Sequence, residues 1–148
     1  MIRVTRRYEF SASHRLNAPG LNETENQLLY GKCNNPFGHG HNYVVDVSVR
    51  GPIDRRSGRA VDLTVLDTLV RERIITALDR RNLNKEIDQF SRLVPTTENL
   101  SLFIHERLKE YWRTAFPGEW PQLEKVRIAE TERNIFEVSE AHENIEAR

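Results

Sequence analysis

The 148-residue chain is short enough for one domain, and its 22 Lys and Arg residues balance its 22 Asp and Glu residues. A net charge of zero, with no block of one sign, argues against nucleic acid or an anionic membrane as a partner. The single cysteine excludes an intrachain disulfide, and no run reaches the roughly 20 apolar residues of a membrane span. We therefore expect one cytoplasmic domain over residues 1–148, with a disordered tail at 141–148.

The N-terminal part of the chain predicts two strands. Residues 2–14 alternate in polarity, so that one face of the first strand carries these side chains: Val4, Tyr8, Phe10, Ala12 and His14. A polar loop follows at 17–30. The second strand is expected from His41 to Arg50, where Gly51-Pro52 ends it.

The middle of the chain predicts two helices. The first starts at Thr64, whose hydroxyl can cap it, and its apolar stripe runs from Leu66 to Leu78. The second follows residues 95–97, and Glu98 in its first turn interacts favourably with the helix dipole.

The C-terminal part predicts a hairpin, with strands at 126–130 and 135–138 joined by a tight turn. The order β-β-α-α-β-β favours an α+β fold, in which two helices cover one face of a four-stranded antiparallel sheet. The other face and both sheet edges would be uncovered in a monomer, and unpaired edges are a liability. We therefore expect the chain to oligomerise.

Three of the five histidines lie within residues 14–41. His39 and His41 are two apart at the start of the second strand, so both imidazoles project to one side, and the first strand delivers His14. Three neutral imidazoles from two strands form a nitrogen set that zinc accepts in catalytic sites, with a fourth position open. Cys33, six residues before His39, leaves open a second interpretation, a closed structural Cys-His₃ zinc site.

Four separated segments carry a resemblance to a known family. They are FSASHRL at 10–16, GKCNNPFGHGHNY at 31–43, PTTENL at 95–100 and VRIAETERNI at 126–135. In this order they resemble the 6-pyruvoyl-tetrahydropterin synthase family, and the similarity covers about residues 4–140. The resemblance implies the tunnelling fold, in which subunits pair their sheets into barrels and trimers stack into homo-hexamers, as dimers of trimers. That assembly agrees with the uncovered edges.

The resemblance also implies roles for individual residues. One Zn²⁺ per chain would be bound by His14, His39 and His41. Cys33 matches the catalytic thiol of the family, and Glu130 matches the carboxylate that anchors the pterin ring of the substrate.

Two further matches concern the substrate pocket and the acid–base pair. Thr96 and Thr97 match threonines that line the pterin pocket. The family's acid–base pair is an Asp-His in a motif like LDHKNL, and residues 78–83 here read LDRRNL. Asp79 therefore matches the catalytic aspartate, but Arg80 replaces the histidine.

This replacement has chemical consequences, because arginine stays protonated at any working pH and Arg80 cannot transfer a proton. It could instead bind substrate phosphate as a bidentate donor, or lower the pKa of the Cys33 thiol. His105 and His142 are the remaining imidazoles. We expect both to be solvated surface residues that do not replace the missing base.

The resemblance implies a zinc-dependent lyase that converts 7,8-dihydroneopterin triphosphate to 6-pyruvoyl-tetrahydropterin with loss of triphosphate. A second branch of the family also releases acetaldehyde and gives 6-carboxy-tetrahydropterin, toward queuosine. The polar loop at 17–30 and the motif at 31–43 resemble the pyruvoyl branch. A third interpretation is a pterin-binding homologue with reduced turnover, because Arg80 replaces the histidine of the acid–base pair.

Overall fold

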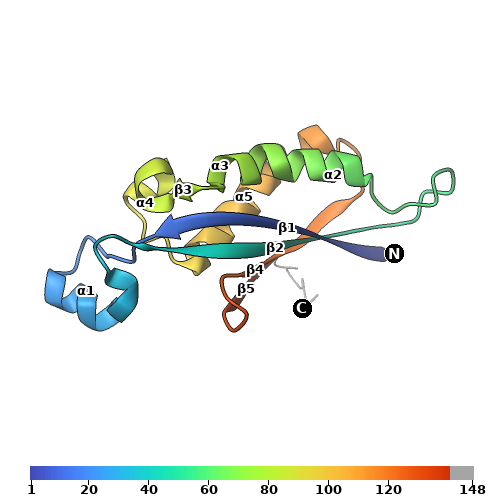
Figure 1. The fold of residues 1–148 in the computed structure, drawn as a ribbon. Helices are drawn as coiled ribbons and strands as arrows, with labels where there is room; N and C mark the ends of the chain where they lie inside the picture. Colours follow the sequence, from blue (N-terminus) through green and yellow to red (C-terminus); the bar gives the residue numbers. More distant parts are fainter. Residues whose placement is uncertain (141–148) are drawn as a thin grey trace, which may run out of the picture.

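Five strands form one sheet in the order β3-β1-β2-β4-β5 (Figure 1). The structure is a computed structural model that describes residues 1–140, so His142 and the expected tail lie outside the described residues. The four longer strands pair antiparallel and have these bounds: β1 Ile2–His14, β2 His39–Gly51, β4 Gln122–Ala129 and β5 Ile135–Ser139. The expected α+β architecture is confirmed.

The expectation of a purely antiparallel, four-stranded sheet was wrong by one strand. β3, Arg81–Asn82, pairs parallel with β1 at Ala12 and Ser13. A two-residue strand is too short to show the alternation that reveals a strand in a sequence. It nevertheless covers the edge of β1 next to His14.

Two helical segments cover one face of the sheet (Figure 1). The first is continuous from α2, Leu63–Val70, through the π-helical turn η2, Arg71–Ile75, to α3, Thr76–Leu78. The second is α5, Thr97–Ala115. The four shorter segments lie outside this layer or beside β3: α1 Glu23–Tyr30, η1 Gly31–Asn34, α4 Leu83–Glu86 and η3 Asp88–Ser91.

Two local predictions need correction. The polar loop at 17–30 contains the helix α1, which begins with a capping box between Asn22 and Glu25. Thr64 does not cap the first long helix, because the Asp62 carboxylate accepts hydrogen bonds from the backbone N–H groups of Thr64 and Val65.

The core lies between the helices and the sheet. The thirteen-residue ladder of β1 and β2 runs from Ile2 opposite Gly51 to His14 opposite His39. Alternation therefore buries one face of each strand, and the fully buried side chains of that face include Tyr43, Val45 and Val47. The same face carries His14 at the end of β1, so the core continues directly into the histidine cluster.

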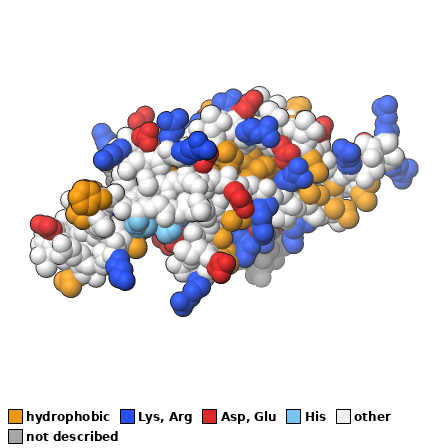
Figure 2. Space-filling model, viewed as in Figure 1, with side chains coloured by type: hydrophobic (Ala, Val, Ile, Leu, Met, Phe, Trp, Pro, Cys, Tyr) orange, Lys and Arg blue, Asp and Glu red, His pale blue; other side chains and the backbone are white. Residues whose placement is uncertain are grey.

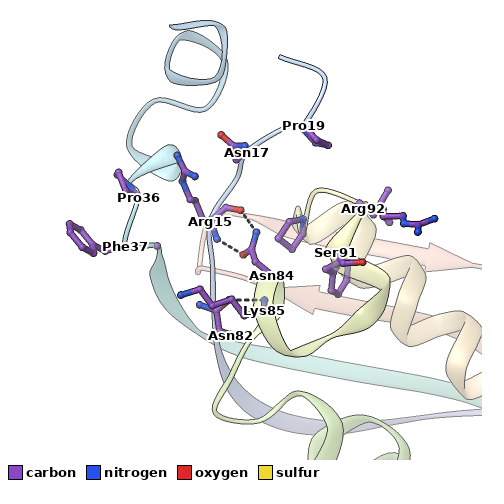
Figure 3. A pocket seen from close by; sticks show the side chains of 14 residues that line it. Arg15, Asn17, Pro19, Pro36, Phe37, Asn82, Asn84, Lys85, Ser91 and Arg92 are labelled. Carbon is purple, nitrogen blue, oxygen red and sulfur yellow. Dashed lines mark hydrogen bonds between the residues drawn. The ribbon is translucent and has the colours of Figure 1, made fainter. Parts of the chain in front are cut away.

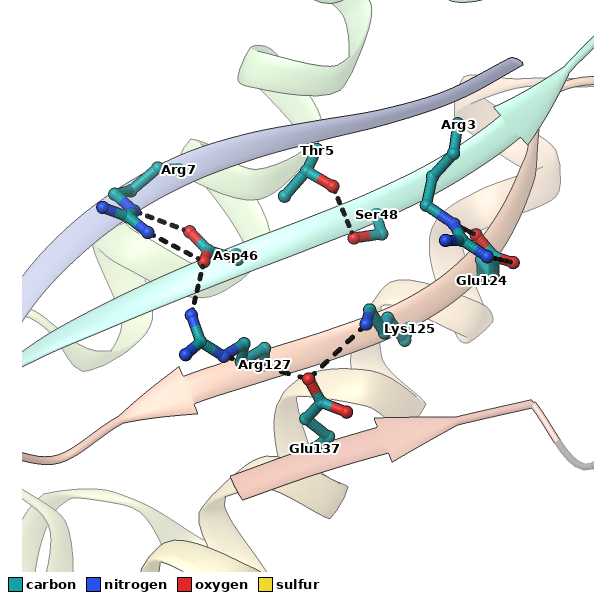
Figure 4. Close-up of polar contacts among 9 residues, drawn as sticks. All are labelled: Arg3, Thr5, Arg7, Asp46, Ser48, Glu124, Lys125, Arg127 and Glu137. Atoms are coloured by element: carbon teal, nitrogen blue, oxygen red, sulfur yellow. Dashed lines mark hydrogen bonds and ion pairs between the residues drawn. The ribbon is translucent and has the colours of Figure 1, made fainter. Parts of the chain in front are cut away.

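The opposite face of the sheet is polar (Figure 4). Asp46, only 6% exposed, accepts hydrogen bonds from the guanidinium groups of Arg7 and Arg127. Beside it, the hydroxyls of Thr5 and Ser48 lie 2.8 Å apart. Charged pairs thus cover this face in place of an apolar layer. Among residues 1–140 no helix has the length and apolar character that a bilayer crossing requires.

Candidate metal and ligand site

Three imidazoles meet at one end of the sheet, as the sequence predicts. His14 ends β1 and lies directly opposite His39, the first residue of β2. His41 follows two residues later on the same face of β2. The Nε2 atoms of His14 and His39 are 3.0 Å apart, and the ligand atoms of all three rings lie within 4.8 Å of one another. Figure 2 shows histidine side chains at the surface near this end of the molecule.

The tautomer of His14 follows from its hydrogen bond. Its Nδ1 lies 2.7 Å from the carbonyl oxygen of Pro95, just before α5. A carbonyl oxygen only accepts, so Nδ1 carries the proton, and the neutral ring directs the lone pair of Nε2 toward the other two imidazoles. A backbone carbonyl that fixes a ring in this way is a common partner of metal-binding histidines.

The electrostatics of the cluster also suit a cation. Burial lowers the pKa of His14 and of His39, with smaller contributions from the neighbouring imidazoles, so both rings favour the neutral form. The Nε2 atom of His41 is buried and has no hydrogen-bond partner among the described residues. A metal ion held by three neutral imidazoles would satisfy this atom. The residues therefore fit a zinc ion, or a similar divalent metal.

Cys33 lies outside this group of ligand atoms. Within residues 1–140 the candidate metal ligands that come together are the three histidines alone. Cys33 sits in η1, partly exposed, and its carbonyl oxygen accepts a hydrogen bond from the backbone N–H of Leu16 at 2.9 Å. The described chain therefore forms a three-imidazole set, not the closed Cys-His₃ set that the sequence left open.

A carboxylate and a hydroxyl complete the cluster. Glu130 follows β4, and its Oε1 atom lies 3.5 Å from His41 Nε2 and 3.7 Å from His14 Nε2. The hydroxyl of Thr97, in the first turn of α5, donates to the same oxygen at 2.8 Å. The Glu130 side chain is 15% exposed, and its Oε2 atom has no hydrogen bond within the described chain. One carboxylate oxygen is thus held, and the other is available to a ligand.

Three other predicted site residues have structural contacts of their own. The hydroxyl of Thr96 caps α5 by accepting from the backbone N–H of Asn99 at 3.2 Å. Asp79 accepts from the backbone N–H of Ser11 at 2.9 Å, and the N–H of Arg80 donates to the Ser11 carbonyl oxygen. These two bonds hold Arg80 at φ 60°, an unusual conformation for a residue other than glycine. Asp79 and Arg80 therefore lie along the edge of β1.

Two further residues belong to the cluster and were not predicted from the sequence. Tyr43 is fully buried, and its ring centroid lies 5.6 Å from that of His41. Its place two residues after His41 on the same strand would have predicted this neighbourhood. Burial raises the pKa of the Tyr43 hydroxyl, so it stays protonated. Pro95 contributes only its backbone carbonyl, and no sequence pattern predicts that contact.

His105, which we expected at the surface, is buried and only 6% exposed. Thr97, Ser101 and His105 follow one another at four-residue spacing on a buried row of α5. The Nε2 atom of His105 lies 3.4 Å from the carboxylate of Glu140, at the end of the described chain. His105 is therefore a buried residue outside the histidine cluster.

Three imidazoles, a carboxylate with one unbonded oxygen and a threonine hydroxyl lie together at the end of the sheet. They define an α+β protein with a candidate site for a metal and a ligand. Comparison with known proteins specifies the family. The family model described as 6-pyruvoyl tetrahydropterin synthase matches residues 3–141. The chain therefore belongs to the 6-pyruvoyl tetrahydropterin synthase family.

Individual relatives agree with this assignment. The chain is 45% identical over 132 residues to the 6-pyruvoyl tetrahydrobiopterin synthase of Poecilia reticulata, covering 89% of this chain and 86% of the relative. It is 42% identical over 132 residues to the protein of that name from Homo sapiens, covering 89% and 87%. The solved 6-pyruvoyl tetrahydropterin synthase of Caenorhabditis elegans superposes with a TM-score of 0.85 at 37% identity, covering 95% and 96%. The predicted tunnelling fold is thereby confirmed at the level of the subunit.

Proposed function

We propose that the protein is a zinc-dependent lyase that converts 7,8-dihydroneopterin triphosphate to 6-pyruvoyl-tetrahydropterin and triphosphate. The main observation in support of this function is the position of Glu130, whose carboxylate lies within 3.7 Å of two imidazoles of the cluster. A ligand bound to this carboxylate would have its neighbouring atoms next to the three histidines. The names of relatives at 42–45% identity support the choice of a pterin as that ligand.

Glu130 would bind the pterin ring. The amino group and ring N–H of a pterin form a paired donor, which a carboxylate accepts through charge-assisted hydrogen bonds. Thr97 holds one oxygen of Glu130 in place, which reduces the freedom that the carboxylate would lose on binding. Thr96 would line the same pocket from the start of α5.

His14, His39 and His41 would hold one zinc ion. The ion would supply Lewis-acid polarisation of the hydroxyl groups on the substrate side chain. The thiolate of Cys33 would accept and return protons at that side chain, as a general base. Asp79 would assist this transfer, and Arg80, which cannot exchange a proton, would act on the substrate through its charge.

A hexameric assembly in the cytoplasm is part of this proposal. β1 is paired by β3 only at Ala12 and Ser13, so most of its outer edge is open, and β5 is the opposite edge. Open edges favour pairing between subunits, and such pairing would place sites at subunit boundaries. Analytical ultracentrifugation tests this point, since a stable monomer at micromolar concentration would contradict it.

Arg80 supports a second candidate, a pterin-binding homologue with reduced turnover. The deciding experiment is incubation of the zinc-loaded protein with dihydroneopterin triphosphate, with the products identified by mass. A pterin with the intact three-carbon side chain supports the proposal. Loss of two carbons as acetaldehyde would assign the 6-carboxy-tetrahydropterin reaction. Tight binding of the substrate without product would favour the second candidate.

A further inference from the structure

The hydroxyl of Tyr43 is a buried donor without a partner. Tyr43 is fully buried beside the histidine cluster, and its hydroxyl oxygen has no hydrogen-bond partner among residues 1–140. A buried hydroxyl that stays unpaired costs free energy, whereas an apolar ring of the same shape avoids that cost. We therefore looked for the polar group that this hydroxyl can reach.

The rings that surround Tyr43 do not supply that group. The Phe10 ring stacks on it, with the ring centroids 5.0 Å apart. The imidazoles of His14 and His41 meet it edge to face, at centroid distances of 6.4 Å and 5.6 Å. The Nδ1 atom of His14 is already bonded to a backbone carbonyl, and the Nε2 atoms of both rings belong to the candidate metal set.

Glu130 and Thr97 are the polar groups near the Tyr43 hydroxyl. β2 and β4 pair Val44 with Ala129, so the next residues along this antiparallel ladder are Tyr43 and Glu130. Burial raises the pKa of the Tyr43 hydroxyl, the charge of Glu130 raises it further, and the Thr97 hydroxyl lowers it. Both side chains are therefore close enough to act on this hydroxyl.

The hydroxyl of Thr97 can accept a hydrogen bond but has no second proton to give. It donates its one proton to Oε1 of Glu130 at 2.8 Å. A hydroxyl oxygen keeps lone pairs after it has donated, so Thr97 can accept from a neighbouring donor. The Tyr43 hydroxyl stays protonated and is such a donor. A chain from Tyr43 through Thr97 to Glu130 then has a single direction, and each bond in such a chain strengthens the next.

Tyr43 would act on a ligand only through these two neighbours. A cavity of about 430 Å³ opens at this end of the molecule, and its lining includes Arg15 and Pro95 but not Tyr43 (Figure 3). Because none of the Tyr43 surface is exposed, its hydroxyl does not touch a ligand in that cavity.

We propose that Tyr43 is a positioning residue, whose hydroxyl donates to the hydroxyl oxygen of Thr97 and thereby fixes the Glu130 carboxylate for its ligand. The proposal rests on the proposed function for the identity of that ligand, a pterin ring. The chain of hydrogen bonds itself does not depend on the ligand. A fixed carboxylate loses less freedom when it binds, so the expected effect is on affinity.

Tyr43→Phe tests the proposal, because it removes the hydroxyl and keeps the ring. In fluorescence titration of the full-length, zinc-loaded protein it should weaken dihydroneopterin binding by about 3–10-fold, the effect of one neutral hydrogen bond. With dihydroneopterin triphosphate as substrate, KM should rise and kcat should not change. Equal affinity of Tyr43→Phe and wild type, or a lower kcat at unchanged KM, would overturn the proposal.

The matched control is Tyr8→Phe. Tyr8 lies on the core face of β1, and its hydroxyl donates to Asp67 at 2.7 Å, away from the histidine cluster. This variant also loses one tyrosine hydroxyl and should leave the dihydroneopterin affinity unchanged. An equal loss of affinity in Tyr8→Phe and Tyr43→Phe would show a general effect of the lost hydroxyls and would contradict a positioning role.

A double-mutant cycle with Thr97→Val shows whether Tyr43 acts through Thr97. In the Thr97→Val background, Tyr43→Phe should cause no further loss of affinity. Urea unfolding of the same four proteins needs no ligand, and the two substitutions should be coupled there as well. Additive losses in either measurement would overturn the proposal. If dihydroneopterin does not bind wild type while the unfolding energies are coupled, the proposed function fails and the positioning contact stands.

Discussion

His14 Nδ1 lies 2.7 Å from the carbonyl oxygen of Pro95, a residue 81 positions later in the chain. This contact ties the start of α5 to the end of β1. It also directs the Nε2 lone pair of His14 toward His39 and His41. Thr97, two residues after Pro95, holds Glu130 in turn. The start of α5 therefore sets the position of the histidine cluster and of the Glu130 carboxylate together.

The first prediction concerns the metal ligands. The protein should bind one zinc ion per chain, and Cys33→Ala should retain it, because the thiol lies outside the group of three imidazoles. His41→Ala should lose the metal, since two imidazoles alone rarely retain zinc. Metal analysis of purified, dialysed protein measures both variants. Loss of zinc by Cys33→Ala, with the fold retained by circular dichroism, would make the thiol a ligand and remove its catalytic assignment.

The second prediction concerns Glu130. Glu130→Gln should weaken pterin binding by about 2–4 kcal/mol, because the charge is lost from a paired hydrogen bond in a partly buried site. Zinc content should not change. Thr97→Val should have a smaller effect in the same direction, since it removes only the donor that holds Glu130. Fluorescence titration with dihydroneopterin measures these affinities, and unchanged binding by Glu130→Gln would refute the role.

The third prediction concerns Arg80. If proton transfer needs a histidine at this position, turnover should be slow, and Arg80→His should raise kcat by up to about 10²–10⁴-fold. The kcat of this variant should also change with pH at about pH 6–7, where an imidazole titrates. If Arg80 instead binds phosphate, Arg80→His should raise KM without raising kcat. Steady-state kinetics from about pH 5 to about pH 9, a range that spans the titration of histidine, distinguish these two roles of Arg80. A variant with unchanged kcat and KM would exclude both.

The fourth prediction concerns the polar face of the sheet. The hydrogen bond from Arg7, together with the contact from Arg127, lowers the pKa of Asp46. A lowered pKa in the folded state means that the stabilisation is present above about pH 4 and is lost as the pH falls through the folded-state pKa. Asp46→Asn should lower the free energy of unfolding by about 1–2 kcal/mol at neutral pH. The loss is small because Arg7 is largely exposed and solvent screens the pair.

The control for this prediction is Glu124→Gln. Glu124 pairs with Arg3 on the same face, where the arginine is also exposed (Figure 4). Urea unfolding at several pH values compares the variants. Asp46→Asn should show a weaker decline in stability than wild type between about pH 4 and pH 2. An identical decline in stability for Asp46→Asn and wild type would mean that Asp46 does not cause this pH dependence.

The alternation of β1 and β2 was sufficient to predict the cluster. A period of two places His14, His39 and His41 on the face that carries Tyr43 and Val45, and the structure confirms this arrangement. The nearness of Glu130 to these imidazoles depends on how β4 pairs with β2. Strand periodicity alone does not determine that pairing, and only the family resemblance indicated the contact.

The errors have local physical causes. α1 was missed because it has no apolar face, and its one buried residue is Asn26. Its capping box between Asn22 and Glu25 was the available signal. His105 was misplaced because it lies off the apolar stripe of α5, whereas the structure buries a second, polar row of that helix. Packing on more than one side of a helix is a tertiary property that a single stripe does not reveal.

If the three-histidine site makes this protein a pterin lyase, release of triphosphate from the substrate must depend on the metal. Purified protein is depleted of metal with a chelator, and triphosphate release from dihydroneopterin triphosphate is followed before and after addition of zinc. We expect release only after zinc is restored, with one triphosphate for each tetrahydropterin formed. Equal release by the metal-depleted protein, or no release by zinc-loaded protein that binds the substrate, would contradict it.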